Sequence, residues 1–84
     1  MHRERSFRGI SKRLAVNYLT GLGGERVGED RVEGADWSAT LSTDKVDVGP
    51  SLSLTEVTVV FEGDEETLPD LIERFAQKAM RAGG

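Results

Sequence analysis

The stretch WSATLST (residues 37–43) alternates apolar and small polar side chains, and this alternation decides the fold class. Trp37, Ala39 and Leu41 fall on one side of an extended chain, whereas Ser38 and Ser42 fall on the other. A period of two is typical of a strand that buries one face and leaves the other in water. Trp37, the only tryptophan, is expected to anchor the core.

Two further strands are expected beside this stretch. Val57, Val59 and Phe61 repeat the alternation, and Gly49-Pro50 predicts a turn between that strand and the one containing Trp37. A weaker strand is expected over residues 26–33, where the apolar positions are fewer. Because the connections are short, the three strands are predicted to form an antiparallel meander.

Helical spacing flanks the strands on both sides. In the N-terminal part, Phe7, Ile10, Leu14 and Tyr18 recur every three or four residues, with Ser6 as the expected N-cap. In the C-terminal part the apolar face is longer and predicts a second helix. Its members are Leu68, Leu71, Ile72, Phe75, Ala76, Ala79 and Met80.

The predicted fold is therefore α+β, with element order αβββα in a single domain spanning residues 1–84. We expect a three-stranded antiparallel meander with both helices on one face. The other face, rich in Ser, Thr and charged side chains, stays open as the natural docking surface for a partner.

The N-terminal residues are strongly basic. Residues 1–13 carry five Lys or Arg side chains against Glu4 alone, whereas the whole chain has a net charge of −4. Residues 1–6 are expected to form a frayed basic arm that the acidic body attracts. Contact with nucleic acid is the disfavoured alternative, because no aromatic residue beyond Phe7 interleaves the basic ones.

Composition bounds the setting in which the protein works. The chain has no cysteine, no apolar run long enough to span a membrane and no signal-peptide core, so we expect a cytoplasmic protein. An acidic surface poor in lysine favours a salt-rich cytoplasm, where salt screens the repulsion between carboxylates. A mildly acidic protein from an ordinary cytoplasm is the alternative.

No enzymatic site is expected. His2, the only histidine, lies at the terminus, and no serine has a histidine and aspartate arranged to activate it. The acidic runs lack the ligand spacing of a calcium loop, so neither a metal nor a cofactor site is predicted. The glycines of residues 20–28 follow a helix and open a strand, the reverse of a phosphate-binding loop.

The chain ends in Gly83-Gly84, which admits two interpretations. The pair resembles the tail of ubiquitin-like modifiers and sulfur carriers, whose terminal carboxylate is adenylated and then passed to sulfide or to a lysine amine. Glycines suit that chemistry because a narrow tunnel excludes side chains. Against it, the predicted helix reaches about Arg81 and leaves almost no extended tail, so the glycines also read as an ordinary helix end.

Three segments carry a family resemblance: NYLTGLGGERV, the run from VEGADWSATLST to VTVVFEGD, and DLIERFAQKAMRAGG. They resemble small haloarchaeal proteins similar to the C-terminal domain attached to some molybdopterin-synthase small subunits (MoaD), which are sulfur-carrier-like. The resemblance implies a protein partner in a sulfur-carrier or activating-enzyme system. It does not imply the β-grasp fold, whose ββαββ order differs from the predicted αβββα.

Two functional hypotheses follow from these observations. In the first, the chain is a non-enzymatic accessory or interaction module of a molybdopterin or sulfur-carrier pathway and acts through its open sheet face. In the second, it is itself a modifier or sulfur carrier, with Gly84 activated and Gly83 as spacer. Assembly with copies of itself remains a third possibility.

Overall fold

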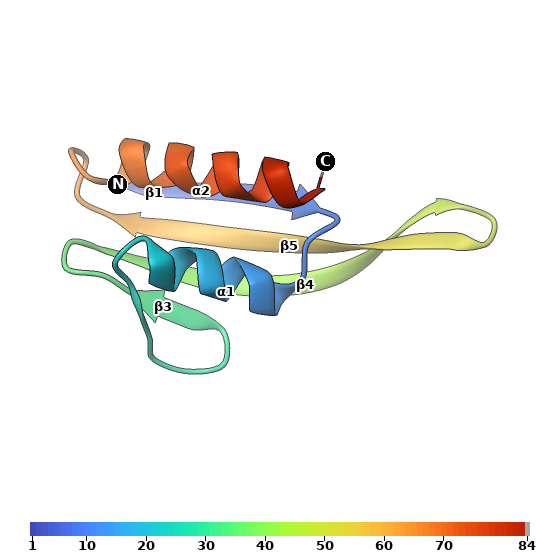
Figure 1. Cartoon of the computed structure of the whole chain (residues 1–84), viewed down its shortest axis with the longest axis horizontal. Helices are drawn as coiled ribbons and strands as arrows, with labels where there is room; N and C mark the ends of the chain where they lie inside the picture. The colour runs from blue at the N-terminus through green and yellow to red at the C-terminus, as the bar shows by residue number, and fades with distance from the viewer. Residues whose placement is uncertain (84) are drawn as a thin grey trace.

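The computed structural model describes residues 1–83 and contains two helices and one antiparallel sheet of five strands (Figure 1). The elements follow one another as β1 (His2–Arg8), α1 (Lys12–Gly21), β2 (Glu25–Arg26), β3 (Arg31–Glu33), β4 (Trp37–Gly49), β5 (Leu52–Gly63) and α2 (Leu68–Gly83). In the sheet the strands lie in the order β1-β5-β4-β3-β2, so the first strand of the chain lies at one edge and pairs with the last strand, β5.

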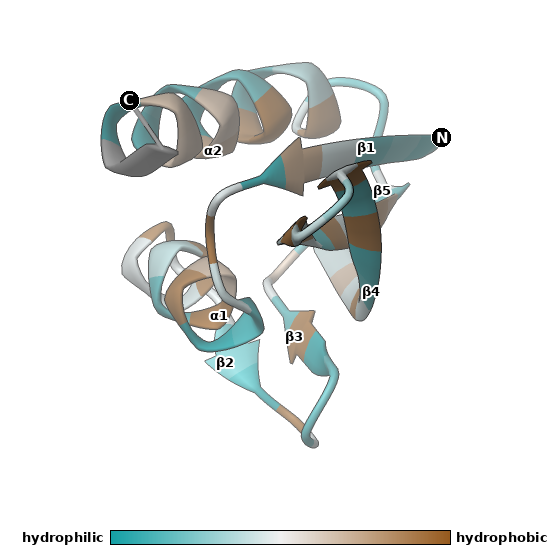
Figure 2. Cartoon of the chain, turned by 90° about the vertical axis from the view of Figure 1, so that its right-hand side faces the viewer, coloured by the Kyte–Doolittle hydropathy of each residue, from teal (hydrophilic) through white to brown (hydrophobic). Residues whose placement is uncertain are grey.

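Both helices cover the same face of the sheet (Figure 2). From the sheet, Val32, Trp37, Leu41, Val59 and Phe61 are buried against the helices. The helices meet them with a second set of buried side chains, among them Ala15, Leu19, Leu68, Ile72, Phe75 and Ala79. Trp37 anchors the core as the alternation predicts, and the α+β class with antiparallel strands is confirmed.

The predicted order αβββα is wrong at the N-terminus, where the chain forms a strand before the first helix. The segment expected as a basic arm runs antiparallel to β5 from the pair His2–Glu62 to the pair Arg8–Glu56. Gly9 follows with a positive φ of 86°, a conformation that suits glycine and ends the strand. The three expected strands are likewise part of a larger sheet, because the weak segment divides into β2 and β3.

The first helix begins five residues later than its spacing suggests. Ser11, not Ser6, is the N-cap, and its hydroxyl accepts a hydrogen bond of 3.1 Å from the amide of Leu14. Phe7 belongs to β1 and Ile10 to the connecting segment, yet both pack on the core. Two core residues outside the helix therefore extended the apparent helical stripe.

The C-terminal helix is confirmed over residues 68–83. Its buried residues are five of the seven predicted, with Ala76 partly covered. Met80 is the exception, because 71% of its surface is exposed. The neighbouring Ala79 is 4% exposed, so the buried face of α2 continues past Phe75 without Met80.

Candidate interaction face

The side of the sheet opposite the helices is uncovered by any other element among residues 1–83. The strand pairing determines which side chains share it, because residues directly opposite one another point to the same side. We define the open face as the even-numbered residues 2–8 of β1, 56–62 of β5 and 38–44 of β4, together with Arg31 and Glu33 of β3. All of these residues are exposed or half-exposed.

Small hydroxyl side chains occupy the middle of the open face. Ser42, Thr58 and Ser6 form a row across three strands, and the hydroxyls of Ser6 and Thr58 lie 3.0 Å apart in a hydrogen bond. Val60, half-buried, is the one apolar member of the open face. A patch of short hydroxyls lets a partner's backbone or side chains approach the sheet closely and exchange hydrogen bonds with it.

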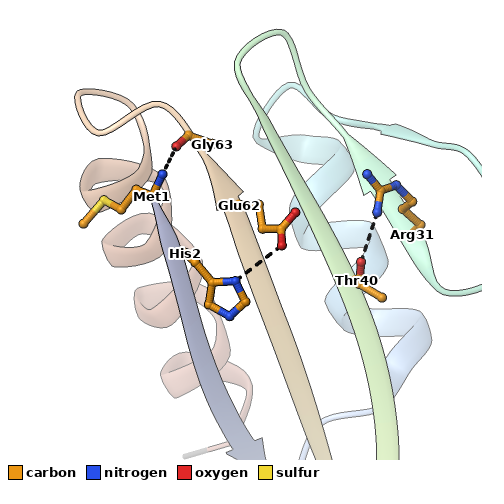
Figure 3. A network of polar contacts seen from close by, with 6 residues as sticks. All are labelled: Met1, His2, Arg31, Thr40, Glu62 and Gly63. Atoms are coloured by element: carbon orange, nitrogen blue, oxygen red, sulfur yellow. Dashed lines mark hydrogen bonds and ion pairs between the residues drawn. The ribbon is translucent and has the colours of Figure 1, made fainter.

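Three polar contacts lie towards the end of the sheet where β1 begins (Figure 3). Nδ1 of His2 lies 3.3 Å from Glu62, and the guanidinium of Arg31 donates to the Thr40 hydroxyl over 3.3 Å. At the same end of β1, the amino group of Met1 donates to the Gly63 carbonyl over 2.9 Å. These contacts are exposed, so they orient side chains more than they stabilise the fold.

The far end of β1 carries a second pair. Nε of Arg8 donates to the Glu56 carboxylate over 3.1 Å, and the Glu56 side chain is the better covered of the two, at 24% exposure against 54%. One arginine of β1 thus pairs with a carboxylate of β5. The expected attraction between the basic N-terminus and the acidic body is seen at Arg8, just beyond the predicted arm of residues 1–6, whereas Arg3 and Arg5 lie opposite Phe61 and Val59.

The open face as a whole is acidic. Glu4, Glu33, Asp44, Glu56 and Glu62 supply five carboxylates, whereas Arg8 and Arg31 supply two guanidinium groups. Such a surface favours a partner that presents lysine or arginine around a patch of hydrogen-bond donors and acceptors. Sequence reasoning predicted the open side but missed the contribution of β1, whose signal is the complementarity of its charges to those of β5.

The predicted conjugation residues lie elsewhere. Gly83 is the last residue of α2, in the helical layer behind the sheet, and Gly84 lies outside the described residues. After α1, Gly23 has a positive φ of 103°, and Gly24 lies so close to Val32 and Trp37 that a side chain would not fit. This agrees with the expectation that these glycines form a turn between a helix and a strand.

Neither a metal-binding cluster nor a membrane-spanning helix is found in residues 1–83. No group of three or more His, Cys, Asp or Glu side chains in this part of the chain is placed to hold a metal ion. Neither of its helices is long and apolar enough to cross a membrane.

Comparison with known proteins places the chain in a family. No curated protein matches it. The model of one family, described as archaeal MoaD-like protein, matches residues 3–84 and so covers every element of the fold. This agrees with the resemblance carried by the segments around Tyr18, Trp37 and Phe75. The chain belongs to the archaeal MoaD-like protein family.

Proposed function

We propose that the chain is a non-enzymatic interaction module of a molybdopterin or sulfur-carrier pathway and binds a protein partner through the open face. The proposal rests on one observation above all: a five-stranded sheet with one face packed under two helices and the other face uncovered, acidic and lined by hydroxyls. Membership of the MoaD-like family supports the pathway and a protein partner. The same proposal places the module in the cytoplasm.

The partner proposed is the molybdopterin-synthase small subunit of the same cell, or the enzyme that activates it. An acidic docking face suits either, provided that the partner presents a basic patch. The row Ser42, Thr58 and Ser6 would lie at the centre of the contact, where water is best excluded. Charged residues such as Glu4 and Glu62 would form its rim and influence mainly the association rate.

A second candidate function is that of a sulfur carrier or protein modifier, favoured by the family and by Gly83-Gly84. In that reaction ATP adenylates the Gly84 carboxylate and releases pyrophosphate. Sulfide or a lysine amine then displaces AMP, which leaves a thiocarboxylate or an isopeptide. The helix reaching Gly83 weighs against it, since about one turn of α2 must unwind before the tail can enter a narrow tunnel.

One alteration separates the two candidates. An alanine appended after Gly84 leaves the sheet untouched, so the module keeps its affinity for the small subunit. The same addition abolishes adenylation, because Gly84 no longer ends in a carboxylate. Binding is measured by calorimetry, and intact-mass spectrometry of protein from its own cytoplasm detects a thiocarboxylate or an isopeptide. A thiocarboxylate on the unaltered protein, lost with the added alanine, would establish the second candidate and contradict the first.

A further inference from the structure

A hairpin arm extends beyond the two helices. We define the arm as residues 44–55, the part of β4 and β5 that projects past the helical layer (Figure 1). On one side, β3 pairs with β4 only as far as Thr40, and the last bond runs from the Leu41 amide to the Asp30 carbonyl over 2.7 Å. On the other side, β1 stops at the pair Arg8–Glu56. A two-stranded ribbon alone is only marginally stable in water.

The arm is apolar on one side. Val46 lies opposite Leu54, and Leu54 and Leu52 keep 37% and 60% of their surface exposed. Val48, beside the register shift near the turn, is 43% exposed. Exposed aliphatic side chains gathered at one end of so small a domain are typical of a contact surface.

The outer edge of β4 offers backbone groups for pairing. Because the Leu41 amide points towards β3, the alternation of an antiparallel ladder directs the backbone groups of Thr43, Lys45 and Asp47 to the same side. Beyond Leu41, no strand among residues 1–83 pairs with that edge. The free length runs from Thr43 to Gly49, where the hairpin turns, and its midpoint is Val46.

We propose that two copies of the chain associate by pairing these free edges of β4 antiparallel, about a two-fold axis at Val46. In this register Lys45 lies opposite Asp47 of the second copy, and Asp47 lies opposite Lys45 of the second copy. Within each pair the two residues direct their amide and carbonyl groups at one another and exchange two hydrogen bonds. The two pairs together therefore form four backbone hydrogen bonds. The two Val46 side chains meet at the axis as a pair without hydrogen bonds, in which side chains approach most closely.

Charge selects this register over its neighbours. A two-fold axis at Asp44, Lys45 or Asp47 would place that residue opposite its own copy and set like charges together. Only the axis at Val46 places Lys45 opposite Asp47 in both directions and also uses the whole free edge. Asp44 then lies opposite Val48 of the second copy and meets no like charge. It further joins the apolar rows of the two arms, in the order Leu54, Val46, Val46 and Leu54 across four strands.

The two charged residues have no competing ion pair within residues 1–83. In their own hairpin Lys45 lies opposite Thr55 and Asp47 opposite Ser53. Substituting either residue therefore removes no salt bridge that the fold itself uses. This makes the charges of the arm a clean test of association.

The first experiment exploits the absence of cysteine in the chain. In a Val46→Cys variant, the two sulfurs would sit on strands whose Cα atoms are about 4.5 Å apart, within the span of a disulfide. Oxidised glutathione should then give a covalent dimer. The matched control is Ser53→Cys on the neighbouring strand, whose copies would lie about 14 Å apart across three strand spacings and should stay monomeric. Equal cross-linking of the two variants, or none by Val46→Cys, would overturn the proposal.

The second experiment is a charge swap. Sedimentation of the wild type from about 1 μM to about 1 mM should show a reversible dimer. Lys45→Asp or Asp47→Lys alone replaces two opposite-charge pairs by like-charge pairs and should raise the dissociation constant at least about tenfold. The double variant Lys45→Asp/Asp47→Lys should restore it, while circular dichroism shows the fold unchanged in all three.

Three outcomes of the charge swap would overturn the inference: a wild type that is monomeric throughout, single variants that dimerise as before, or a double variant that fails to recover. A wild type that is monomeric throughout would indicate that the apolar arm contacts a different protein. The association is separate from the proposed function, because the substituted residues lie outside the open face. A variant of Lys45 or Asp47 that loses the dimer should therefore still bind the small subunit. Failure of one proposal can thus be told apart from failure of the other.

Discussion

Phe75 joins four elements of the fold through its ring. The side chain is fully buried in α2, and its centroid lies 5.1 Å from Phe7 of β1, 6.2 Å from Tyr18 of α1 and 5.7 Å from Phe61 of β5. All three contacts are edge-to-face, the arrangement that aromatic pairs prefer. The Phe75 ring therefore contacts α1 and the two neighbouring strands β1 and β5, and it joins both helices to this edge of the sheet.

Truncating this ring should be costly. We expect Phe75→Ala to lower the free energy of unfolding by about 3–5 kcal/mol, because the cavity forms where four elements meet and cannot collapse. The exposed Lys78→Ala, one turn away, should change it by less than about 0.5 kcal/mol. Urea unfolding followed by circular dichroism measures both, and equal effects would contradict this account of the core.

Two glycines near the end of α1 give opposite expectations. A Cβ added to Gly24 would lie 2.5 Å from Cγ1 of Val32 and 2.9 Å from the Leu19 carbonyl oxygen, whereas one added to Gly21 meets nothing within 4 Å. Gly24→Ala should therefore destabilise by about 1–3 kcal/mol, through displacement of the core. Gly21→Ala should be neutral or stabilising by up to about 1 kcal/mol, because alanine favours the helix. The melting temperatures of the two variants test this difference. Shifts of the same sign and size in both melting temperatures would contradict it.

At the scale of elements, β1 is the strand that completes the open face. The amide of Gly63 donates to the Met1 carbonyl over 3.1 Å, and the amide of Gly9 donates to the Thr55 carbonyl over 3.3 Å. In an antiparallel ladder the bonds recur at every second residue between such points. Arg3, Arg5 and Phe7 thus direct their amides at β5, and the amides between them point to solvent.

Hydrogen exchange tests whether β1 is a strand or a frayed arm. We expect the amides of Arg3, Arg5 and Phe7 to exchange at least about tenfold more slowly than those of Glu4 and Ser6, because only the former are bonded to β5. Residue-resolved exchange by NMR measures the alternation. Uniformly fast exchange over residues 2–8 would restore the frayed arm and remove a quarter or more of the open face.

The sequence predicts those elements that bury a periodic row of apolar side chains. The helical spacing of Leu68, Leu71 and Phe75 defines α2, and the alternation from Trp37 to Leu41 defines the first part of β4. β1 escaped prediction for the opposite reason: Phe7 is its one partly buried residue, and the strand is held by backbone bonds and by charges on β5. The open face was predictable as a polar side of strands, but its rows depend on a register that no local pattern specifies.

At the scale of the whole molecule, charge dominates the surface. The net charge is −4. Five ion pairs are found within residues 1–83, and in four of them at least one partner has more than half of its side chain exposed. In the fifth, Arg31–Glu33, the two side chains are 44% and 47% exposed. Exposed pairs contribute little to stability, and salt screens them along with the repulsion between carboxylates. Screening of the repulsion between carboxylates should prevail in a chain with an excess of acidic groups.

The melting temperature should therefore rise as potassium chloride is raised from about 0.1 M to about 2 M. Differential scanning calorimetry measures it, with a neutral osmolyte as the control for general exclusion effects. A flat or falling melting temperature would show that attraction outweighs repulsion on this surface. It would also remove the argument for a salt-rich cytoplasm.

The most direct test of the proposed function is calorimetric titration of the chain with the molybdopterin-synthase small subunit of the same cell. Ser42→Arg places a long cation in the middle of the open face, whereas Gln77→Arg places the same side chain on the exposed side of α2. We predict that the wild type and Gln77→Arg bind alike and that Ser42→Arg binds at least about tenfold more weakly, a loss of about 1.4 kcal/mol. Equal binding by all three proteins, or weakening by Gln77→Arg instead, would contradict recognition through the open sheet.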